Sequence, residues 1–522
     1  MTSGEWVDLA QAGVPQTVQA DFCVIGGGAA GIYLATELSR NGCDVVLLEA
    51  GPRRCVDAET IGLGALFDGP DYRGATAGRF FGLGGSTSRW GGQLVPHSHH
   101  DVRQDRGSAT AWASIVNDVS IHGSAVLNRL HCARGADFSS PIPPLAGTAT
   151  QVLARCGLEV QHALVMPFRH KNFVGILLRG TSGSTTPRTY FNAVVSSWRV
   201  EPGVAGEARV TGLVASAPNG HRLNVTARKF VLAAGAIESA RMLLELNESA
   251  NGRVLAAQSA VGCYLTDHLS VSIADVVPED TAAAANLFAP RFFGSWMRSH
   301  RLLEAVSPSG SLRAFAHFIF SMESPGFELA RAALGALQGR RLPSLSVNEV
   351  VTGSRDLLRL AYHRYARSAL YVPSGTPVHL QLDMEQRPVR SNRIRLCNER
   401  DRYGRRKANV RWRVSDEDMD AVACTARRLI SKWRGAGSGL PSLVSRFVGD
   451  GGAKPHDAYH PVGTCRMGED EQSVVDYDLR VHGVKNLWLT STGVLPSAGT
   501  ANPTFTMLCL THKLAGHLRT LN

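Results

Sequence analysis

The chain has 522 residues, of which 44% are hydrophobic and 19% are charged. Because single hydrophobic cores stop growing at about 250–300 residues, this length predicts two domains rather than one. The formal net charge is +11, but Lys and Arg form no single run, and no zinc-finger, RNA-recognition or basic-zipper pattern occurs, which argues against a nucleic-acid-binding protein.

The cysteines and the first residues indicate the compartment. None of the ten cysteines forms a C-x-x-C pair, and several lie in apolar strand or helix patterns, as buried free thiols of a reducing compartment do. Met1 to Ala20 does not have the basic leader and apolar stretch of a signal peptide. The chain also has no apolar run of about 18 residues, so no transmembrane helix is predicted. A cytoplasmic enzyme is expected. The cysteines are Cys23, Cys43, Cys55, Cys132, Cys156, Cys263, Cys397, Cys424, Cys465 and Cys509.

The first predicted unit is a strand, a glycine-rich turn, a helix and a second strand. The apolar run 21–25 is typical of a buried parallel strand, and it continues directly into a G-x-G-x-x-G turn. A helix pattern follows over 32–40, and a second strand over 44–48 ends at Glu49, 18 residues after Gly31. This order predicts a dinucleotide-binding Rossmann unit.

Each residue of the turn has a physical task. Gly26 permits the tight turn, Gly28 lets the backbone approach a diphosphate, and Gly31 lets the helix pack on the strand. Ala29 and Ala30, inside the turn, are also predicted cofactor contacts, and the free N–H groups at the N-terminus of the helix that follows favour negative charge. Glu49 is expected to bind ribose hydroxyls, which argues against NADP but leaves FAD and NAD open.

A second glycine-rich segment runs from Phe81 to Gly92, where two Gly pairs flank small hydroxyl residues. Such a segment lets the backbone lie against a flat ligand. The residues predicted to contact the cofactor there are Gly84, Gly85, Ser86, Arg89, Trp90, Gly91 and Gly92.

Further along, 229–239 reads as a strand, a turn and a helix start. By itself this segment is equally consistent with a cofactor contact and with a plain structural strand–helix unit. Ala234 and Gly235 in this segment, and Val195 before it, are predicted cofactor contacts.

Residues 287–372 are rich in aromatic, Arg and His residues. Within them, Ser354 to Leu370 combines arginines and apolar residues at helical spacing, which favours an amphipathic helix that covers the core over one that binds a membrane surface or a partner. The sequence leaves a lid, a membrane-facing helix and a partner surface open for the region as a whole.

Three strands are predicted next. Residues 381–386 alternate as a strand, 392–396 are expected to pair with it, and 409–413 add a third strand after the turn at 401–404. Ser415 is a good N-cap for the helix that follows.

The C-terminal part carries the most specific pattern. Tyr459-His460-Pro-Val-Gly-Thr464 precedes a strand over 486–490, and Ala501-Asn502-Pro503-Thr504 opens a final helix. Together with the two glycine-rich segments, 229–239 and the Asp267-His268 block, these motifs resemble the glucose-methanol-choline (GMC) oxidoreductase family. The C-terminal sequence, with Ala501-Asn502-Pro503-Thr504, is most similar to the pyranose-oxidase-like and bacterial sugar-dehydrogenase branches of that family.

The resemblance implies an α/β fold with an FAD-binding, Rossmann-like domain assembled from discontinuous segments, 19–99, 193–275 and 452–522. It also implies an α+β substrate domain, 100–192 and 276–451, with a large, mostly antiparallel sheet over the isoalloxazine. FAD becomes the expected cofactor, and Asn502, Pro503 and Thr504 join its expected contacts.

In that family the position of His460 holds the base that faces the flavin, and the position of Asn502 holds its partner. A neutral imidazole accepts the hydroxyl proton of an alcohol, an uncharged amide holds the substrate oxygen, and a hydride leaves for flavin N5. The expected substrate is a small alcohol, with a secondary hydroxyl of a sugar, glycoside or related metabolite favoured by the resemblance.

Some family members attach FAD covalently through a histidine in the loop before Trp90, where this chain has Arg89. Non-covalent FAD is therefore expected, with Arg89 near the cofactor or the base of the loop.

Two histidine groups imitate metal sites. These are 97–101, with three histidines and an aspartate, and His456 with His460. The second pair lacks the Glu of H-E-x-x-H and follows Pro455, and no cysteine pair supports either group, so no structural metal is expected.

Two other functions stay open. The same family includes hydroxynitrile lyases, in which FAD does no redox chemistry, and the basic helical segment is also consistent with a flavin-bound subunit that needs a partner. Oxygen, a quinone or a protein are all candidates for the electron acceptor.

Overall fold

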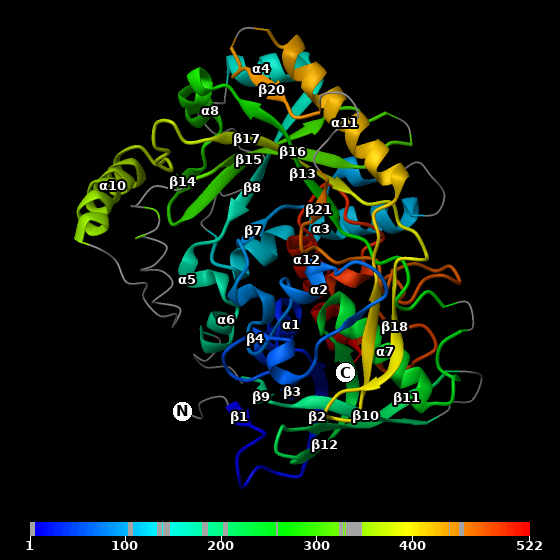
Figure 1. Ribbon diagram of the computed structural model, residues 1–522. Coiled ribbons are helices and arrows are strands. Elements are labelled where there is room, and N and C mark those ends of the chain that lie inside the picture. Colours follow the sequence, from blue (N-terminus) through cyan, green and yellow to red (C-terminus); the bar gives the residue numbers. More distant parts are fainter. Residues whose placement is uncertain are drawn as a thin grey trace.

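The computed structural model describes residues 6–102, 108–132, 138, 147–179, 186–201, 207–256, 259–308, 310–322, 327, 329, 347–437, 439–447 and 454–521. Part of the 287–372 region therefore lies outside the described residues. Figure 1 shows two β-sheets, one in the lower and one in the upper half of the molecule.

The lower sheet contains the predicted Rossmann unit. β2 (Thr17–Ile25) lies between β3 (Val45–Leu48) and β12 (Arg222–Leu232), and all three are parallel. Residues 22–25 and 45–48 are buried throughout, as strands covered on both faces are. The order of the sheet is β1 (Trp6–Asp8), β9 (Arg188–Phe191), β3, β2, β12, β11 (Arg209–Ser216) and β10 (Val194–Glu201), and β22 (Leu487–Leu489) also pairs with β12.

Helices from both ends of the chain pack beside this sheet. The predicted first helix is α1 (Ala29–Arg40), which packs against α12 (Pro503–Thr520), and α12 packs against α3 (Ala109–Arg129). The predicted strand–turn–helix after residue 229 is confirmed as β12 and α7 (Gly235–Ser249). The C-terminal helix thereby joins the cofactor domain that the N-terminus begins (Figure 1).

The upper sheet is antiparallel throughout, which confirms the large antiparallel sheet expected for the substrate part. Its order is β20 (Leu443–Ser445), β13 (His268–Val276), β17 (Val378–Glu385), β16 (Ala314–Phe320), β15 (Trp296–Glu304), β8 (Leu158–Val165) and β7 (Gln93–Leu94), with β14 (Arg291–Phe293) on β15 and β21 (His456–Asp457) on β13. α11 (Asp416–Gly435) contacts β13 and β20, and Ser415 caps it through a capping box with Asp418.

One predicted strand pairing is wrong. β18 (Arg393–Arg400) does not pair with β17, but forms a separate three-stranded sheet with β19 (Arg406–Arg411) and β5 (Leu66–Phe67). Pro388 interrupts the chain after β17, and Ile394 donates its backbone N–H to Gly262, so the strand turns to another partner. This small sheet packs on α7.

The predicted domain boundaries stay a proposal, and strand pairing interleaves the two parts more finely. β9 lies within 100–192 yet extends the lower sheet, whereas β7, β13 and β21 lie within the predicted cofactor segments yet belong to the upper sheet. Single short strands of this kind have no separate signal in the sequence.

The helix expected after Ser354 is α10 (Val347–Ala366), at the left-hand edge of Figure 1. It does not cover the core as expected: over 354–366 no apolar side chain is buried, and Leu358, Tyr362 and Tyr365 are exposed. Arg364 ties the helix to β14 by stacking on Phe292, with 3.9 Å from its guanidinium carbon to the ring centroid.

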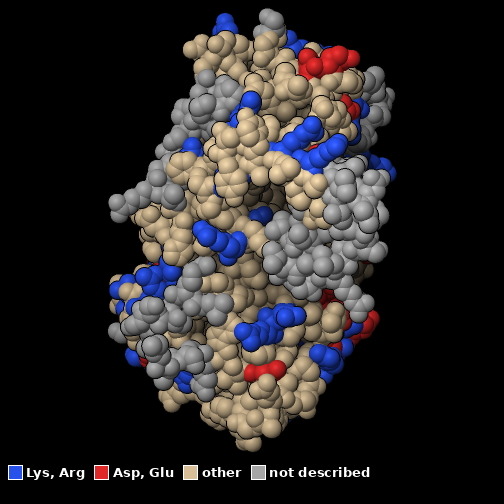
Figure 2. Space-filling model, turned by 90° about the vertical axis from the view of Figure 1, so that its left-hand side faces the viewer, with Lys and Arg blue, Asp and Glu red and all other residues tan. Residues whose placement is uncertain are grey.

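Short elements complete the described fold: β4 (Val56–Asp57), β6 (Phe80–Phe81), α2 (Arg73–Thr76), α4 (Thr148–Arg155), α5 (Phe168–Lys171), α6 (Val174–Arg179), α8 (Thr281–Phe288) and the 3₁₀ helices Glu59–Ile61, Gly85–Ser88, His99–Asp101, Pro278–Asp280 and Thr492–Val494. All ten cysteines are free, as expected, but only five are buried: Cys424 is exposed, and Cys55, Cys156, Cys263 and Cys397 are partly exposed. Figure 2 shows Lys and Arg in several separate groups on one face, which also has a hollow near mid-height.

None of the helices in the described part of the chain is long and apolar enough to cross a membrane. The expected compartment stays a prediction.

Candidate active site

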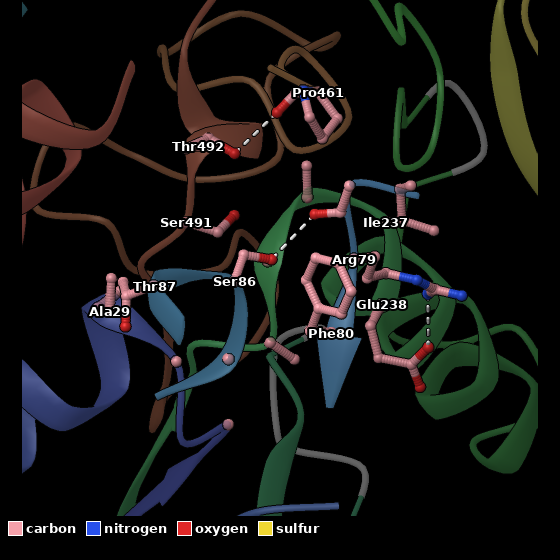
Figure 3. A pocket seen from close by; sticks show the side chains of 18 of the residues that line it. Ala29, Arg79, Phe80, Ser86, Thr87, Ile237, Glu238, Pro461, Ser491 and Thr492 are labelled. Carbon is pink, nitrogen blue, oxygen red and sulfur yellow. Dashed lines mark hydrogen bonds and ion pairs between the residues drawn. The ribbon is translucent and has the colours of Figure 1, made fainter. Parts of the chain in front are cut away.

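A cavity of about 690 Å³ lies where the carboxyl ends of β2, β3 and β12 meet residues from the C-terminal part. Ligands bind at this edge of parallel sheets because the helix N-termini and turns that follow the strands converge there. Figure 3 shows side chains from four distant segments around the cavity, among them Ala29, Thr87, Glu238 and Thr492.

The structure brings nearly all predicted site residues into this one cavity. Those that line it are Gly26, Gly28, Ala29, Ala30, Glu49, Gly85, Ser86, Arg89, Trp90, Gly91, Gly92, Val195, Ala234, Gly235, His460, Asn502, Pro503 and Thr504. Gly31 and Gly84 do not line it and support the turns behind it. Gly84, for example, donates its backbone N–H to the carbonyl oxygen of Gly27, with 2.8 Å between the atoms.

The glycines of the first turn are required by close contacts. An added Cβ at Gly26, where φ is +114°, lies 2.5 Å from the carbonyl oxygen of Ala233, and one at Gly31 lies 1.8 Å from that of Gly26. At Gly28, by contrast, an added Cβ meets no protein atom within 4 Å. Gly28 is the N-cap of α1, and it lines the cavity together with Ala29 and Ala30, so the helix N-terminus faces the cavity.

Glu49 is buried at the end of β3. Its carboxylate accepts hydrogen bonds from the backbone N–H groups of Gly27 (2.7 Å), Gly51 (2.8 Å) and Gly82 (2.8 Å). Burial raises the pKa of this carboxyl to about 7, against the lowering effect of those N–H groups. Further donors, such as ribose hydroxyls, would favour its ionised form.

A buried ion cluster that the sequence analysis missed forms another wall. Glu238 of α7 pairs with Arg405 (3.0 Å), with Arg241 (2.8 Å) and with Arg79 (3.6 Å), and Figure 3 shows Arg79 pointing toward Glu238. The Nε and Nη1 atoms of Arg79 are buried and have no hydrogen-bond partner among the described residues. Because these residues come from separate parts of the chain, no local pattern identifies them.

His460 and Asn502 meet in the cavity wall, where the Nε2 atom of His460 lies 3.1 Å from Nδ2 of Asn502. Burial lowers the pKa of His460 to about 4, so its imidazole is neutral at ordinary pH. The Oδ1 atom of Asn502 is buried and has no partner among the described residues. The pair therefore offers an uncharged base beside an unused hydrogen-bond acceptor.

Asp267 and His268 support His460 from the start of β13. Asp267 accepts hydrogen bonds from the backbone N–H groups of His460 (2.8 Å) and His268 (2.7 Å) and from the hydroxyl of Tyr72. His268 places its Nδ1 atom 3.1 Å from Nδ1 of His460. The sequence analysis used this Asp-His block only to establish the resemblance and gave neither residue a role.

Arg89 lines the cavity from the second glycine-rich segment, as expected. It pairs with Asp57 at 3.7 Å and lies over the ring of Phe80, with 4.5 Å from its guanidinium carbon to the ring centroid. Its side chain is 38% exposed, so it stands at the rim rather than in the depth of the cavity.

The first of the histidine groups that imitate metal sites has structural partners. His97 is buried and contacts Thr506 and the carbonyl of Ala498, while Asp101 accepts from the backbone N–H and the hydroxyl of Thr500. These two residues thus hold the loop that leads to Asn502.

Two clusters in the described residues bring three potential ligand atoms together, His99–His100–Glu159 and Asp267–His268–His460. In the second, the Asp267 carboxylate already accepts the hydrogen bonds described above. The expectation that no structural metal binds stays a prediction.

Comparison with known proteins relates this site to a family of enzymes. The model of the family described as "GMC oxidoreductase" matches residues 388–511, and that of an NAD(P)-binding Rossmann-like domain matches residues 24–81. An uncharacterized GMC-type oxidoreductase of Mycobacterium tuberculosis is 26% identical over 561 residues, which cover 92% of this chain and 95% of the relative.

Shorter matches reach named enzymes. Pyridoxine 4-oxidase of Microbacterium luteolum is 60% identical over 45 residues, 9% of each chain, and an oxygen-dependent choline dehydrogenase of Citrobacter koseri is 44% identical over 62 residues, 12% of this chain and 11% of the relative. Among solved structures, a pyridoxine 4-oxidase has a TM-score of 0.58 at 16% identity, covering 96% of this chain and 99% of its own, and shows the same fold.

The protein is thus a flavoenzyme by fold and site. Its C-terminal part matches the GMC oxidoreductase family model, as the sequence motifs indicated, and the protein is an FAD-dependent oxidoreductase that acts on CH–OH groups.

The residues present fit FAD. Gly28 leaves open space at the N-terminus of α1 where a diphosphate would bind, and Glu49 ends β3 where ribose hydroxyls would bind. The Nε atom of Arg79 and the Oδ1 atom of Asn502 are buried and have no hydrogen-bond partner among the described residues, and a ligand in this cavity would satisfy them.

Proposed function

We propose that the protein oxidises a hydroxyl of a small alcohol to a carbonyl, with His460 as the base and Asn502 as the group that holds the substrate oxygen. The observation that carries this proposal is the buried His460–Asn502 pair in the wall of the cofactor cavity. Bound FAD supplies the acceptor for the hydride that leaves the carbinol carbon.

The residues of this chain perform the proton transfer. The neutral Nε2 atom of His460 takes the hydroxyl proton, and burial keeps the imidazole unprotonated beforehand. Asn502 keeps the oxygen in register without adding a charge beside the base. The remaining electron pair on the oxygen then forms the carbonyl as the hydride leaves.

For the substrate, we propose a secondary hydroxyl of a sugar, a glycoside or a related metabolite. The support is the likeness of the Ala501–Thr504 block to the sugar-oxidising branches of the family. The named relatives carry choline and pyridoxine in their names, so both alcohols belong in any substrate test.

The test is anaerobic mixing of the purified holoenzyme with a panel of sugars, choline and pyridoxine while flavin absorbance is followed. Bleaching by a member of the panel is expected. Cleavage of a substrate while the flavin stays oxidised would instead establish a lyase.

Replacing His460 by Ala is expected to lower the rate of flavin reduction about 10²–10⁴-fold, the usual contribution of a positioned base. The variant should keep its FAD, which absorbance measures. An unchanged rate would remove His460 from the role of base.

We also propose that FAD is held without a covalent bond, because Arg89 occupies the place of the tethering histidine and pairs with Asp57. Acid precipitation is expected to leave the yellow colour in the supernatant. Colour that stays with the denatured protein would contradict the proposal.

A further inference from the structure

Two buried histidines contact each other behind the proposed base. His268 is the first residue of β13 and is fully buried. Its Nε2 atom lies 3.0 Å from the carbonyl oxygen of Gly499, and its Nδ1 atom lies 3.1 Å from Nδ1 of His460. Phe315 packs edge-to-face on the His268 ring at 5.5 Å, which fixes its plane.

The chemistry of these contacts assigns the protons. A carbonyl oxygen only accepts, so Nε2 of His268 carries the hydrogen. A neutral imidazole has one N–H group, which leaves Nδ1 of His268 as an acceptor. The hydrogen between the two rings therefore belongs to Nδ1 of His460, and Nε2 of His460 has a free electron pair.

We propose that His268 is the positioning residue that holds His460 in the tautomer with its proton on Nδ1, so that Nε2 faces the substrate as a base. This proposal rests on the proposed function, in which His460 takes the hydroxyl proton. His268 is not among the residues that line the cavity, and it acts through His460 alone.

The surroundings of the pair agree with a neutral His268. Burial, together with His460, lowers the pKa of His268 to about 3. The charged and titratable groups that act on the two rings come from several elements: Asp383 of β17 raises both pKa values, Arg301 of β15 lowers both, and His97 lowers that of His460.

Asn502 and Asp267 complete the arrangement without competing for the same atom. In the site without substrate, the Nδ2 group of Asn502 donates to the electron pair that this tautomer leaves on Nε2 of His460, and the substrate hydroxyl has to replace this hydrogen bond before Nε2 takes its proton. Asp267 binds the backbone N–H of His460 rather than its ring. Of these groups, His268 is the one in contact with Nδ1 of His460.

The same contact serves the reaction. When His460 takes the substrate proton on Nε2, its ring becomes cationic, and the Nδ1–H group still donates to the electron pair of His268. No proton has to leave His268, so it stays neutral throughout.

The test compares His268→Asn with His268→Leu, two side chains of similar size. Asn keeps an acceptor atom close to the position of Nδ1, whereas Leu removes it. The primary readout is ¹⁵N NMR of the protein labelled in its histidine rings, with the His460 signals assigned from a His460→Gln sample, because this measures the tautomer without any turnover.

The wild-type protein and His268→Asn are expected to show the proton of His460 on Nδ1. His268→Leu is expected to move it toward Nε2, because the buried Nδ1–H group loses its acceptor, and to lower kcat about 10–100-fold with little change in KM. A packing role for His268 would be served as well by Leu as by Asn.

A proton on Nε2 of His460 in the wild-type protein overturns the proposal, and that spectrum decides even where the His268→Leu substitution prevents folding. Equal tautomer ratios in folded, FAD-loaded His268→Asn and His268→Leu also overturn it. Failure of the proposed function looks different, because a His460→Gln variant would then reduce its flavin at the wild-type rate.

Discussion

At the scale of single residues, burial decides the chemistry of His460. Its pKa is lowered from 6.5 to about 4 because the cavity wall removes water from the charged form. A histidine with that pKa is neutral, and able to accept a proton, over the whole range above about pH 5.

This property predicts the pH dependence of the reaction. A lowered pKa means that the protonated, inactive form of His460 appears only in acid, so kcat/KM should rise with pH around about pH 4 and be flat through pH 6.5. Stopped-flow measurement of flavin reduction from about pH 4 to pH 9 tests this. A limb centred at pH 6.5, the ordinary value, would show that His460 is hydrated in the working enzyme.

Asn502 provides the control for that measurement. Asn502→Asp places a negative charge beside Nε2 of His460 and should move the acidic limb to higher pH, since an opposite charge favours the protonated imidazole. Asn502→Ala should lower the rate without that upward movement of the limb. If the acidic limb stays at the same pH in both variants, it reports the titration of a group other than His460.

The residues that sequence motifs identified are those whose role depends on local chemistry. His460, Asn502 and Glu49 follow recognisable neighbours, and all three line the cavity. Arg79 and Arg405 could not be found in this way, because their importance comes from converging on Glu238 from segments far away in the sequence.

At the scale of elements, the packing of α1 on β2 leaves no space for a side chain at Gly26 or at Gly31. Gly31 lies in a helix that starts directly against the strand, and the carbonyl of Gly26 occupies the place of a side chain. The sequence predicted this unit well because a G-x-G-x-x-G turn specifies its own geometry.

Gly31→Ala is therefore expected to destabilise the protein by about 1–3 kcal/mol, as overpacking usually does, and to reduce bound FAD. Gly516→Ala in α12 is the matched control, because a Cβ there meets nothing within 4 Å. It should stabilise the helix by roughly 0.5–1 kcal/mol. Thermal unfolding of the two variants, with the FAD content of each, measures the difference, and equal melting temperatures would contradict the clash.

Strand pairing was harder to predict than strand position. Residues 381–386 and 392–396 do form strands over most of their length, in β17 and β18 respectively. However, β18 pairs with β19 and packs on α7, and it does not pair with β17. Alternating patterns show which face of a strand is buried and say nothing about which neighbour it pairs with. The exposed side chains of α10 have the same origin, since amphipathic spacing does not reveal whether anything covers the apolar stripe.

At the scale of the whole molecule, the cavity is lined by segments that lie far apart in the sequence. The first glycine-rich turn, α7, the β18–β19 turn and the C-terminal loop all contribute lining residues. A ligand that contacts all of them stabilises the folded chain by mass action, because it binds the native state alone.

Removal of FAD is accordingly expected to lower the melting temperature, and adding it back at about 100 times its Kd should restore about 2.7 kcal/mol. Calorimetry of the apoprotein and the reconstituted protein tests this, with NAD in place of FAD as the control ligand. Equal protection by NAD would contradict the selectivity for FAD.

The loop in front of Asn502 is held by Asp101 and His97, which lie 399 and 401 positions before their partners in the chain. Synthesis on the ribosome proceeds from the N-terminus, so these two residues are made long before the loop they secure. The Rossmann turn can form early, but the wall that carries His460 and Asn502 closes only when the last segment has emerged and α12 has docked on α1. The nascent chain thus forms its flavin-binding turn before the loop that carries the proposed base and its partner, so the proposed chemistry has to wait for the synthesis of α12.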